Sequence, residues 1–495
     1  MSGTLSVVGN SRRREEDRAL VVSLFNEEDL RRIHDAALET LDRVGFDLPH
    51  QETRGRLADL GARVEEGGTR IRVSPDVVDR CLAAAGKTFT LYGRDQARVA
   101  EFGVGKRNYN SIAGEALWVD VPGGERRYCR LDDVGVAARF GDALPELTIV
   151  GAMADPQELP TSVRCVYVLA ELIRNTTKPV VFWFGNRKAA RYVCDMLVAL
   201  RGSEAEAAVR PYTYHLLEPI NPLRFPFDGV DLLYETARLR MPIAVGPMAQ
   251  MGVSAPCTIA GTMAQEHAEI LAGICVVQAV APGTPVCYGG ICHALDMRTT
   301  QMIFAGPEQA IFGVGMTQMG KRLGLPVYIN VGLTDAKRPD AQAGLEVGVT
   351  LMLGAAAGAD VFGHLGIAGV DQASSLDMLV MQHEAIRYVE SVLRTVEVSD
   401  RTLALDEVAE VGPGGSFLDR MHTARNFRRE LWFPDILDRI FYEPWREAGA
   451  WSFEKACQNH REKLLRRHAA ASLDADIECE VARILDAALR DLGTA

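Results

Sequence analysis

The fold is predicted from a repeating unit, seen in PVYINVG at residues 326–332 and again in ADVFGHL at residues 359–365. Each is a short apolar run typical of a strand that is buried on both faces, and each leads into a sequence with helical periodicity. The same unit recurs upstream, at residues 147–153, 179–185, 212–218, 242–248 and 284–289. Successive starts lie 32, 33, 30, 42, 42 and 33 residues apart, a spacing that predicts strand–helix units in a parallel sheet.

An eighth strand is expected at Asn108 to Ala113, ahead of the other seven. Eight strand–helix units close into a TIM barrel of about 250 residues, whereas a doubly wound open sheet more often carries an early phosphate-binding turn. No GxGxxG motif follows the first strand here. We therefore predict an α/β fold, a (β/α)8 TIM barrel that occupies residues 105–396.

The flanking regions differ from the barrel in pattern. Residues 1–25 are expected to be extended or disordered, and residues 26–104 to form an irregular α+β region that begins with a helix capped by Asn26. Residues 397–495 carry Asp, Glu and Arg on helical patterns with aromatic anchors such as Phe441 and Trp451. This helical C-terminal segment is predicted to be a cap or an oligomerisation element, so we expect a homo-oligomer.

Composition excludes several classes of protein. The 495 residues are 47% hydrophobic and 24% charged, with a formal net charge of −12 and no basic run longer than Arg12 to Arg14. Nucleic acids and anionic membranes require clustered positive charge, so neither is an expected partner. No apolar stretch reaches the roughly 20 residues of a membrane span, and the first 18 residues do not resemble a secretory signal. The ten scattered cysteines are typical of reduced thiols, and we predict a cytoplasmic protein.

Active sites of TIM barrels lie at the carboxyl ends of the strands, so the strand pattern itself nominates residues. Each residue taken alone could be a helix cap or a packing group, so the prediction of a site depends on the set rather than on any single residue. The candidates are Asn110, Ser111, Phe184, Asn186, His215, Glu218, Met248, Gln250, Tyr288, His293, Asn330, Thr334, Asp335 and His364.

A zinc site at Cys287, Cys292 and His293 is rejected. The Cys-x4-Cys-His spacing is not a usual one, and no second Cys/His group is close in sequence. His215 and His364 could still supply distant ligands, but we expect no metal bound directly by this chain.

Three segments carry a specific resemblance: PMAQMGVSAPCTIAGT at 247–262, YGGICHALDMR at 288–298 and the polar loop VGLTDAKRPDAQAG at 331–344. They resemble the MttB-type trimethylamine methyltransferase superfamily, and the resemblance extends over residues 25 to 490. It implies transfer of a methyl group from a methylated amine to a corrinoid (cobalamin) carried by a separate partner protein.

The resemblance also separates two branches. The methanogen enzymes carry pyrrolysine near the end of the strand that leads into the Thr334 loop, where this chain has Leu333 or another ordinary neighbour. The chain therefore resembles the non-pyrrolysine branch, whose substrates are quaternary amines such as glycine betaine. A quaternary ammonium departs as a neutral tertiary amine, so it needs no covalent helper.

A quaternary ammonium is bound by aromatic faces. The expected substrate-binding aromatics are Phe184, Tyr288, Tyr328 and Phe362. Strand alternation leaves two arrangements open: Phe182 and Phe184 face inward with Trp183 under the helices, or the reverse.

Polar groups complete the predicted site. His215, Asn330 and His364 are the expected catalytic residues, and Gln250, Thr334 and Asp335 are expected to bind substrate. A buried, satisfied core histidine is the alternative for either histidine. The acids Asp371, Asp377 and Glu384 either receive the corrinoid protein or form a solvated rim.

The sequence thus predicts a methyltransferase that moves a methyl group from a glycine betaine-like amine to the Co(I) of a cognate corrinoid protein. Two alternatives remain: a methylcorrinoid:pterin methyltransferase, and a non-catalytic protein that binds betaine or docks the corrinoid protein.

Overall fold

The computed structural model describes residues 20–493, and all eight predicted barrel strands are present in it. The strands are shorter than the apolar runs from which they were predicted. The strands are β6 (Asn108–Ser111), β9 (Val150–Gly151), β10 (Val180–Val181), β11 (His215–Leu217), β12 (Ile243–Val245), β14 (Val286–Gly290), β17 (Val327–Ile329) and β18 (Val361–Leu365).

The eight strands form a closed ring. Six of them pair side by side in the order β11-β12-β14-β17-β18-β6, all parallel, and β9 pairs in parallel with β10. A parallel bridge from Asn110 to Ile149 joins β6 to the strand of β9. The N–H of Val180 donates to the carbonyl of Tyr212, which joins β10 to the strand of β11. The closed parallel sheet confirms the predicted TIM barrel.

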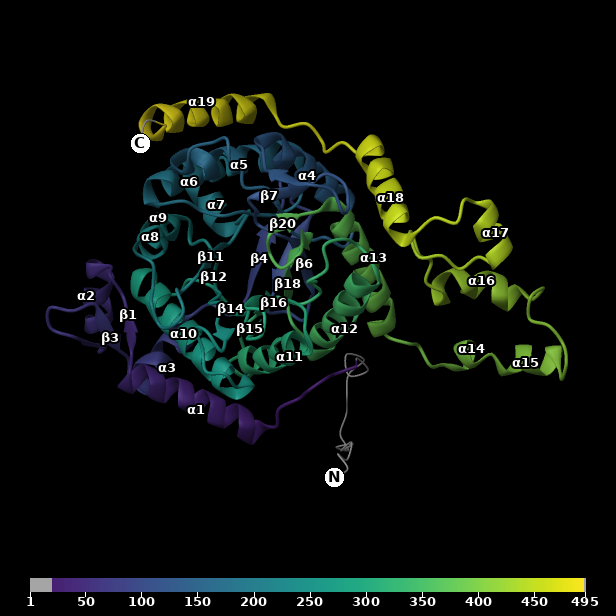
Figure 1. The fold of residues 1–495 in the computed structure, drawn as a ribbon, viewed down its shortest axis with the longest axis horizontal. Helices are drawn as coiled ribbons and strands as arrows, with labels where there is room; N and C mark the ends of the chain where they lie inside the picture. Colours follow the sequence, from purple (N-terminus) through teal and green to yellow (C-terminus); the bar gives the residue numbers. More distant parts are fainter. Residues whose placement is uncertain (1–19, 494–495) are drawn as a thin grey trace.

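Helices surround the barrel on its outside (Figure 1). Each barrel strand leads into at least one of them, and extra short strands precede the helix after β6, β12, β14 and β18. The helices are α4 (Leu131–Ala143), α5 (Thr161–Asn175), α6 (Arg187–Arg201), α7 (Glu204–Val209), α8 (Phe227–Asp231), α9 (Leu233–Thr236), α10 (Ile259–Val280), α11 (Pro307–Arg322), α12 (Ala341–Ala357) and α13 (Leu376–Leu393). The extra strands are β7 (Leu117–Val119), β8 (Arg126–Tyr128), β13 (Gln250–Met251), β15 (His293–Asp296), β16 (Gln301–Ile303), β19 (Ile367–Ala368) and β20 (Ala373–Ser374).

The N-terminal region closes one end of the barrel. Its hairpin of β4 (Phe89–Tyr92) and β5 (Val99–Phe102) places Leu91 and Phe102 in one buried cluster with Tyr214 and Tyr328. The predicted N-terminal helix is α1 (Glu27–Arg43), and the side chain of Asn26 caps it as expected. The remaining elements of this region are β1 (Phe46–Asp47), α2 (Gln51–Asp59), β2 (Arg63–Val64), β3 (Arg70–Arg72) and α3 (Pro75–Ala84). Of residues 1–25, which were expected to be extended or disordered, residues 1–19 lie outside the described residues.

The C-terminal segment is helical, as predicted, and has two parts. Helices α18 (Phe453–Arg467) and α19 (Ala475–Leu492) pack on the outside of the barrel, where Arg174 of α5 pairs with Glu478 of α19. Helices α14 (Asp400–Leu403), α15 (Leu405–Val411), α16 (Met421–Glu430) and α17 (Tyr442–Glu447) project away from the barrel (Figure 1). Among residues 20–493, no helix has the length and apolar character to span a membrane. All ten cysteines are free thiols.

Candidate functional site

Strand alternation sorts the barrel aromatics into two groups. Trp183, Tyr214 and Tyr328 pack with the inner cluster that the β4–β5 hairpin also joins. Phe182 and Phe184 stack on each other, 4.8 Å between ring centres, on the outer face of β10. Of the two arrangements left open by the sequence, the second is therefore found: Trp183 faces the barrel interior, and Phe182 and Phe184 face the helices.

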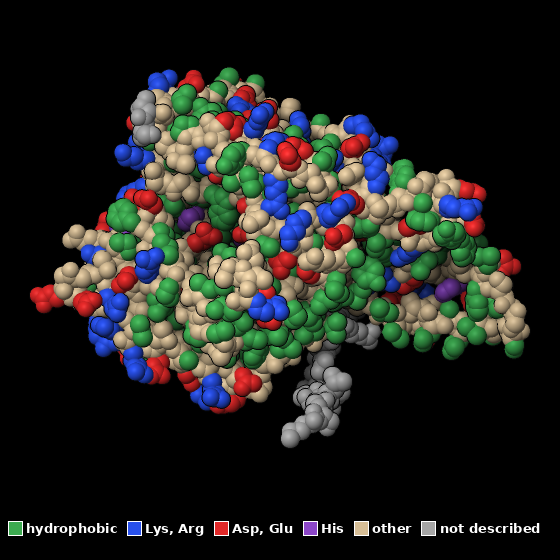
Figure 2. All heavy atoms as spheres, viewed as in Figure 1, with side chains coloured by type: hydrophobic (Ala, Val, Ile, Leu, Met, Phe, Trp, Pro, Cys, Tyr) green, Lys and Arg blue, Asp and Glu red, His purple; other side chains and the backbone are tan. Residues whose placement is uncertain are grey.

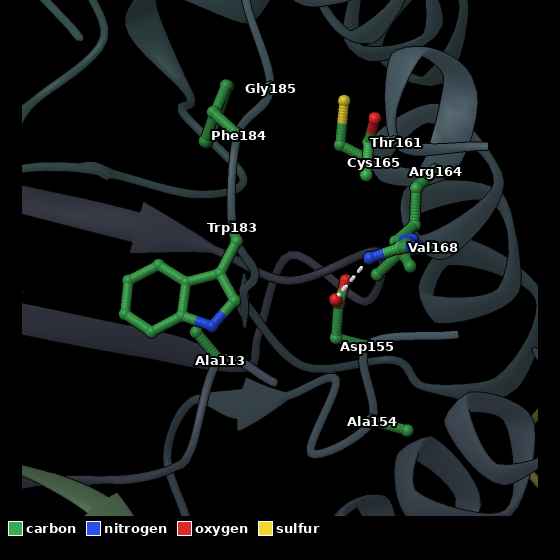
Figure 3. Close-up of a pocket in the computed structure, with 10 residues that line it drawn as sticks. All are labelled: Ala113, Ala154, Asp155, Thr161, Arg164, Cys165, Val168, Trp183, Phe184 and Gly185. Carbon is green, nitrogen blue, oxygen red and sulfur yellow. Dashed lines mark hydrogen bonds and ion pairs between the residues drawn. The ribbon is translucent and has the colours of Figure 1, made fainter. Parts of the chain in front are cut away.

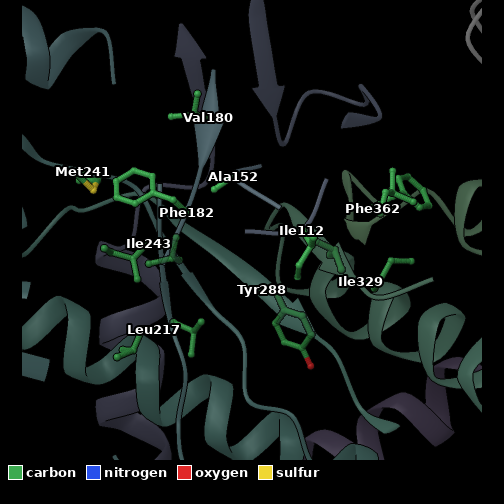
Figure 4. Packing of buried hydrophobic residues seen from close by; sticks show 14 of the residues in the cluster. Ile112, Ala152, Val180, Phe182, Leu217, Met241, Ile243, Tyr288, Ile329 and Phe362 are labelled. Carbon is green, nitrogen blue, oxygen red and sulfur yellow. The ribbon is translucent and has the colours of Figure 1, made fainter. Parts of the chain in front are cut away.

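Three of the four expected substrate-binding aromatics consequently lie outside the barrel interior. The hydroxyl of Tyr288 is 2.9 Å from Nδ1 of His267 on α10, Phe362 stacks on Tyr109, and Phe184 packs edge-on against His215. Figure 4 shows Tyr288 and Phe362 among the residues that pack between strands and helices. Of these four aromatics, Tyr328 packs with the inner cluster.

His364 reaches the interior through a break in alternation. Its backbone is left-handed, with a φ of 63°, and the register of β18 against β6 shifts between Phe362 and Leu365. The bulge turns the imidazole toward Trp183 and Tyr328, with ring centres 6.2 and 6.1 Å away. Gly363 makes room beside it, because a Cβ there would overlap the hydroxyl of Tyr328.

Asn330 sets the protonation of His364. Its Nδ2 lies 3.0 Å from Nδ1 of the imidazole, and because an amide nitrogen can only donate, Nδ1 accepts and the ring proton sits on Nε2. Burial lowers the pKa of His364, which keeps the ring neutral. The site therefore offers a neutral imidazole in a fixed tautomer.

Three carboxyl groups gather at the carboxyl ends of the strands. Glu115 follows β6, Glu218 follows β11, and Asp371 follows β18. Burial, and next the charge of Asp371, raise the pKa of Glu218 to about 7, and the same two causes raise the pKa of Glu115 well above its usual range. Within residues 20–493, none of the three forms an ion pair with Lys, Arg or His. We call these three acids, together with Trp183, Tyr328, Asn330 and His364, the barrel-mouth cluster.

Buried polar atoms without partners mark the same interior. Oδ1 of Asn330, directly after β17, and Oδ1 of Asn110 in β6 accept no hydrogen bond within the described chain. The ring nitrogens of His293 have no hydrogen-bond partner in the described chain either, and burial lowers the pKa of that ring to about 3. Such orphaned groups cost about 1 to 3 kcal/mol each, so an interior that keeps several is built to receive a polar ligand or ordered water.

A cavity of about 180 Å3 opens beside the cluster, between the ends of β6, β9 and β10 and helix α5. Figure 3 shows the indole of Trp183 on one side and the ion pair of Arg164 with Asp155 on the other. The indole N–H donates to the carbonyl of Gly114 at 2.7 Å, which holds the ring in place. Trp183 thus presents its ring to the cavity, to the imidazole of His364 and to the barrel interior.

Four other predicted residues contact residues outside the barrel-mouth cluster. His215 begins β11 rather than ending it, its ring faces Phe184 outside the barrel, and burial lowers its pKa to about 3. Thr334 donates to Glu346 at 2.6 Å, and Asp335 accepts the N–H of Phe304 at 2.7 Å, so both fasten the polar loop. Gln250 pairs by its backbone with His293, in the short ladder of β13 with β15.

The rim acids divide in the same way. Asp377 pairs with Arg461 of α18 at 2.8 Å, and Glu384 accepts backbone N–H groups, so both acids have partners within the described chain. Asp371 alone joins the site. Glu115 was not a candidate, because the loop after β6 carries no strand or helix period that would single it out. Among the described residues, no group of three or more His, Cys, Asp or Glu is arranged to hold a metal ion.

The chain matches known proteins over nearly its whole length. The model of the family described as Trimethylamine methyltransferase (MTTB) matches residues 8–488. The glycine betaine methyltransferase of Desulfitobacterium hafniense (strain Y51) is 26% identical, over 93% of this chain and 95% of that protein. The trimethylamine methyltransferase MttB2 of Methanosarcina mazei is 28% identical, over 95% of this chain and 96% of that protein.

Among solved structures, the hydroxylamine complex of MtmB resembles this chain with a TM-score of 0.48 and 11% identity, over 97% of this chain and 96% of that chain. The family match spans far more than half of the sequence and includes the barrel, the mouth cluster and the C-terminal helices. This chain therefore belongs to the trimethylamine methyltransferase (MTTB) family and is an amine methyltransferase.

Proposed function

We propose that this enzyme removes a methyl group from a quaternary amine of the glycine betaine type and delivers it to the Co(I) of a corrinoid held by a separate protein. The observation that carries the proposal is the barrel-mouth cluster. It sets aromatic rings, and three carboxyl groups that form no ion pair within the described chain, around a neutral histidine at the end of a TIM barrel where substrates bind.

The aromatic part of the cluster suits a soft cation. The ring centres of Trp183 and Tyr328 lie 6.2 and 6.1 Å from that of His364, and burial raises the phenol pKa of Tyr328, so the ring stays uncharged. A cation over such a face gains about 0.5 to 2 kcal/mol, most where water is excluded. The trimethylammonium group would rest against the faces of these rings.

The carboxyl groups give the same region a negative character. Glu218 and Asp371 stand without a cationic partner in the described chain, so a bound quaternary ammonium would supply the missing positive charge. A betaine also carries a carboxylate. The Nε2–H of His364, whose Nδ1 is occupied by Asn330, is the donor available to it.

The partner-held corrinoid supplies the nucleophile, Co(I), which forms a bond to the methyl carbon while the carbon–nitrogen bond breaks. The electron pair of that bond stays on nitrogen, and the product is a neutral tertiary amine. The residues of this chain would hold the donor in line and keep water away. No side chain has to give or take a proton, which agrees with a neutral, fixed His364.

The test is a donor panel. The purified protein is incubated with cob(I)alamin, and then with a cognate corrinoid protein, and methylcobalamin formation is followed by absorbance. The donors are glycine betaine, proline betaine, carnitine, γ-butyrobetaine, tetramethylammonium, dimethylsulfoniopropionate and trimethylamine.

We expect methylation from one carboxylated quaternary amine and none from trimethylamine. Turnover of trimethylamine alone would contradict the quaternary-amine assignment and leave the family membership intact. Methylation of a pterin from methylcobalamin, without amine turnover, would favour the alternative of a methylcorrinoid:pterin methyltransferase.

A further inference from the structure

Glu115 and Asp371 form a pair of acids at the barrel mouth. Ala373 of β20 pairs with Leu117 of β7 in a parallel register, and each acid lies two residues before one of these partners. Neighbouring strands lie about 4.8 Å apart, so the register brings the two carboxyl groups within reach of each other. Their side chains form a hydrogen bond. The pairing of two short strands therefore holds two carboxyl groups together.

The backbone fixes both acids. The N–H of Glu115 donates to the carbonyl of Met153 at 3.0 Å, and the carbonyl of Glu115 accepts the N–H of Asp155 at 2.8 Å. Asp371 lies in the turn of the β19–β20 hairpin, where Val370 and Asp371 have left-handed φ values of 62° and 54°. A β-branched residue such as valine seldom adopts this region, so the fold accepts strain where it places Asp371.

A proton between the two carboxyl groups explains how they can be neighbours. Two ionised carboxylates repel, and within residues 20–493 neither acid pairs with Lys, Arg or His. Oδ1 of Asp371 is buried and has no hydrogen-bond donor in that part of the chain. Burial, and next the charge of Asp371 and the hydrogen bond to it, raise the pKa of Glu115 to about 9. One shared proton therefore stays on the pair at neutral pH.

The groups beside Glu115 leave this proton in place. Figure 2 shows many acidic side chains beside basic ones on the face that it displays. Asp155, whose charge also raises the pKa of Glu115, follows this pattern and pairs with Arg164 at 2.5 Å (Figure 3). Burial raises the pKa of the Cys129 thiol to about 12, so the thiol is neutral. None of these groups competes for the proton of the pair.

Two charged groups act on the side of Asp371. Arg126 of β8 lies along the turn, because its guanidinium donates to Gln372 at 2.9 Å and would overlap a Cβ on Gly369. A positive charge on this side favours the ionised form of Asp371 and leaves the proton on Glu115. Burial, and next the charge of Asp371, raise the pKa of Glu218 to about 7. At neutral pH the pair is thus the acid that keeps its proton most firmly among these three carboxyl groups.

The pair borders the place where the substrate nitrogen would lie. Glu115 follows Gly114, whose carbonyl accepts the indole N–H of Trp183 at 2.7 Å. Burial lowers the pKa of His364, and the charge of Asp371 opposes this shift, so the acid acts on the imidazole. A donor held against the indole and the imidazole would therefore have the acid pair beside it.

Methyl transfer leaves an electron pair on nitrogen, and the product is a tertiary amine. The same electron pair can take the methyl group back. An aliphatic amine holds a proton with a pKa of about 10, above the pKa of Glu115, so a proton passes from this acid to the amine. Once the electron pair carries a proton, the methyl group cannot return to it.

We propose that Glu115, held in place by Asp371, gives the shared proton to the nitrogen of the tertiary amine after the methyl group has left. The O–H bond of Glu115 breaks and its electron pair stays on the carboxylate, while the N–H bond forms from the electron pair that methyl transfer left on nitrogen. Water returns a proton to the acid pair after the product has gone. The methyl transfer step itself stays free of proton movement. The inference rests on the proposed function, since a tertiary amine must first be formed.

Infrared difference spectra of the full chain test the proton directly. In Glu115→Gln the amide keeps the size of the side chain and still donates to Asp371, but it has no proton to give. Glu125→Gln is the matched control, because Glu125 is exposed between β7 and β8 and forms no ion pair within residues 20–493. Glycine betaine and then dimethylglycine, or the active donor of the panel and its demethylated amine, are added at pH 8. The C=O band of a protonated carboxyl group is followed.

We expect the wild type and Glu125→Gln to show a band that Glu115→Gln lacks, and to lose it when the tertiary amine replaces the quaternary amine. In a single turnover with cob(I)alamin, Glu115→Gln should retain the rate of methyl transfer. The ratio of methylcobalamin to cob(I)alamin at the end of that first phase should fall by about tenfold, the factor for one pKa unit between acid and amine.

Asp371→Asn is the second variant. Its amide donates to Glu115 and favours the ionised form of that acid, so both the band and the high ratio should be lost. A band that persists with the tertiary amine bound, or an unaltered ratio in both variants, would overturn the proposal and leave the proposed function standing. A wild type that demethylates no quaternary amine would overturn both.

Discussion

The barrel interior and the projecting segment of residues 394–456, which holds α14 to α17 and is here called the arm, depart from the ordinary rules of burial in opposite directions. The interior buries polar atoms without partners, among them Oδ1 of Asn110 and of Asn330. The arm leaves large apolar side chains in water, with Phe441 the extreme case. Both departures cost free energy in the isolated chain, and both are relieved by binding.

The chemistry of the groups that lack contacts indicates which kind of molecule would bind them. Buried acceptors, carboxyl groups without ion pairs and aromatic faces inside a barrel suit a small, charged ligand. Exposed aliphatic and aromatic residues on short helices suit a protein surface. Substitutions in the barrel interior should therefore change catalysis, and matched substitutions in the arm should leave catalysis unaltered.

Asn330→Leu should have the largest effect on catalysis. Without the amide, Nδ1 of His364 has no partner and the imidazole is free to turn, and misplacement of this order costs about 100-fold in kcat/KM. Steady-state methyl transfer measures the loss. Asn426→Leu, the same change in the arm, should leave kcat/KM unaltered, and equal losses in both variants would break the distinction between the two regions.

Trp183→Leu should raise KM for a quaternary amine by about 2- to 30-fold, which corresponds to a cation–aromatic contact of about 0.5 to 2 kcal/mol. Trp183→Phe should lose less, because a ring remains. The matched change Trp451→Leu in the arm should leave KM unchanged. An unaltered KM in Trp183→Leu would remove the indole from the substrate site.

Glu218 should make binding depend on pH by a few-fold. With a pKa of about 7, this carboxyl is protonated below that pH and negative above it, so KM for a quaternary ammonium should fall as the pH rises from 6 to 8. A quaternary nitrogen has no proton to lose in this range. Glu218→Gln should flatten the profile, and a profile of wild-type shape in that variant would assign the dependence to another group.

The eight strands could be predicted because parallel strands buried on both faces appear as apolar runs at regular spacing. The orientation of side chains could not be predicted with the same security. Alternation left the Phe182–Trp183–Phe184 segment open, and the fold resolved it by packing Phe182 and Phe184 against each other on the outer face.

His364 shows a different limit. Plain alternation from Tyr328 and Val361 would put it outside, and only the bulge and its positive φ turn it inward. Glu115 and Asp371 lie in loops, where no period marks the residue that meets another across the barrel mouth. The arm was predicted as a helical segment, but no sequence pattern showed that none of its residues would be buried.

Isotopic labelling tests the transfer of an intact methyl group from a quaternary amine most directly. Glycine betaine with three deuterated methyl groups is incubated with the enzyme and its corrinoid protein under reducing conditions, and both products are measured by mass spectrometry. We expect CD3-cobalamin and dimethylglycine with two deuterated methyl groups, in equal amounts. Absence of CD3-cobalamin with this donor and with the other quaternary amines, while trimethylamine yields methylcobalamin, would contradict it.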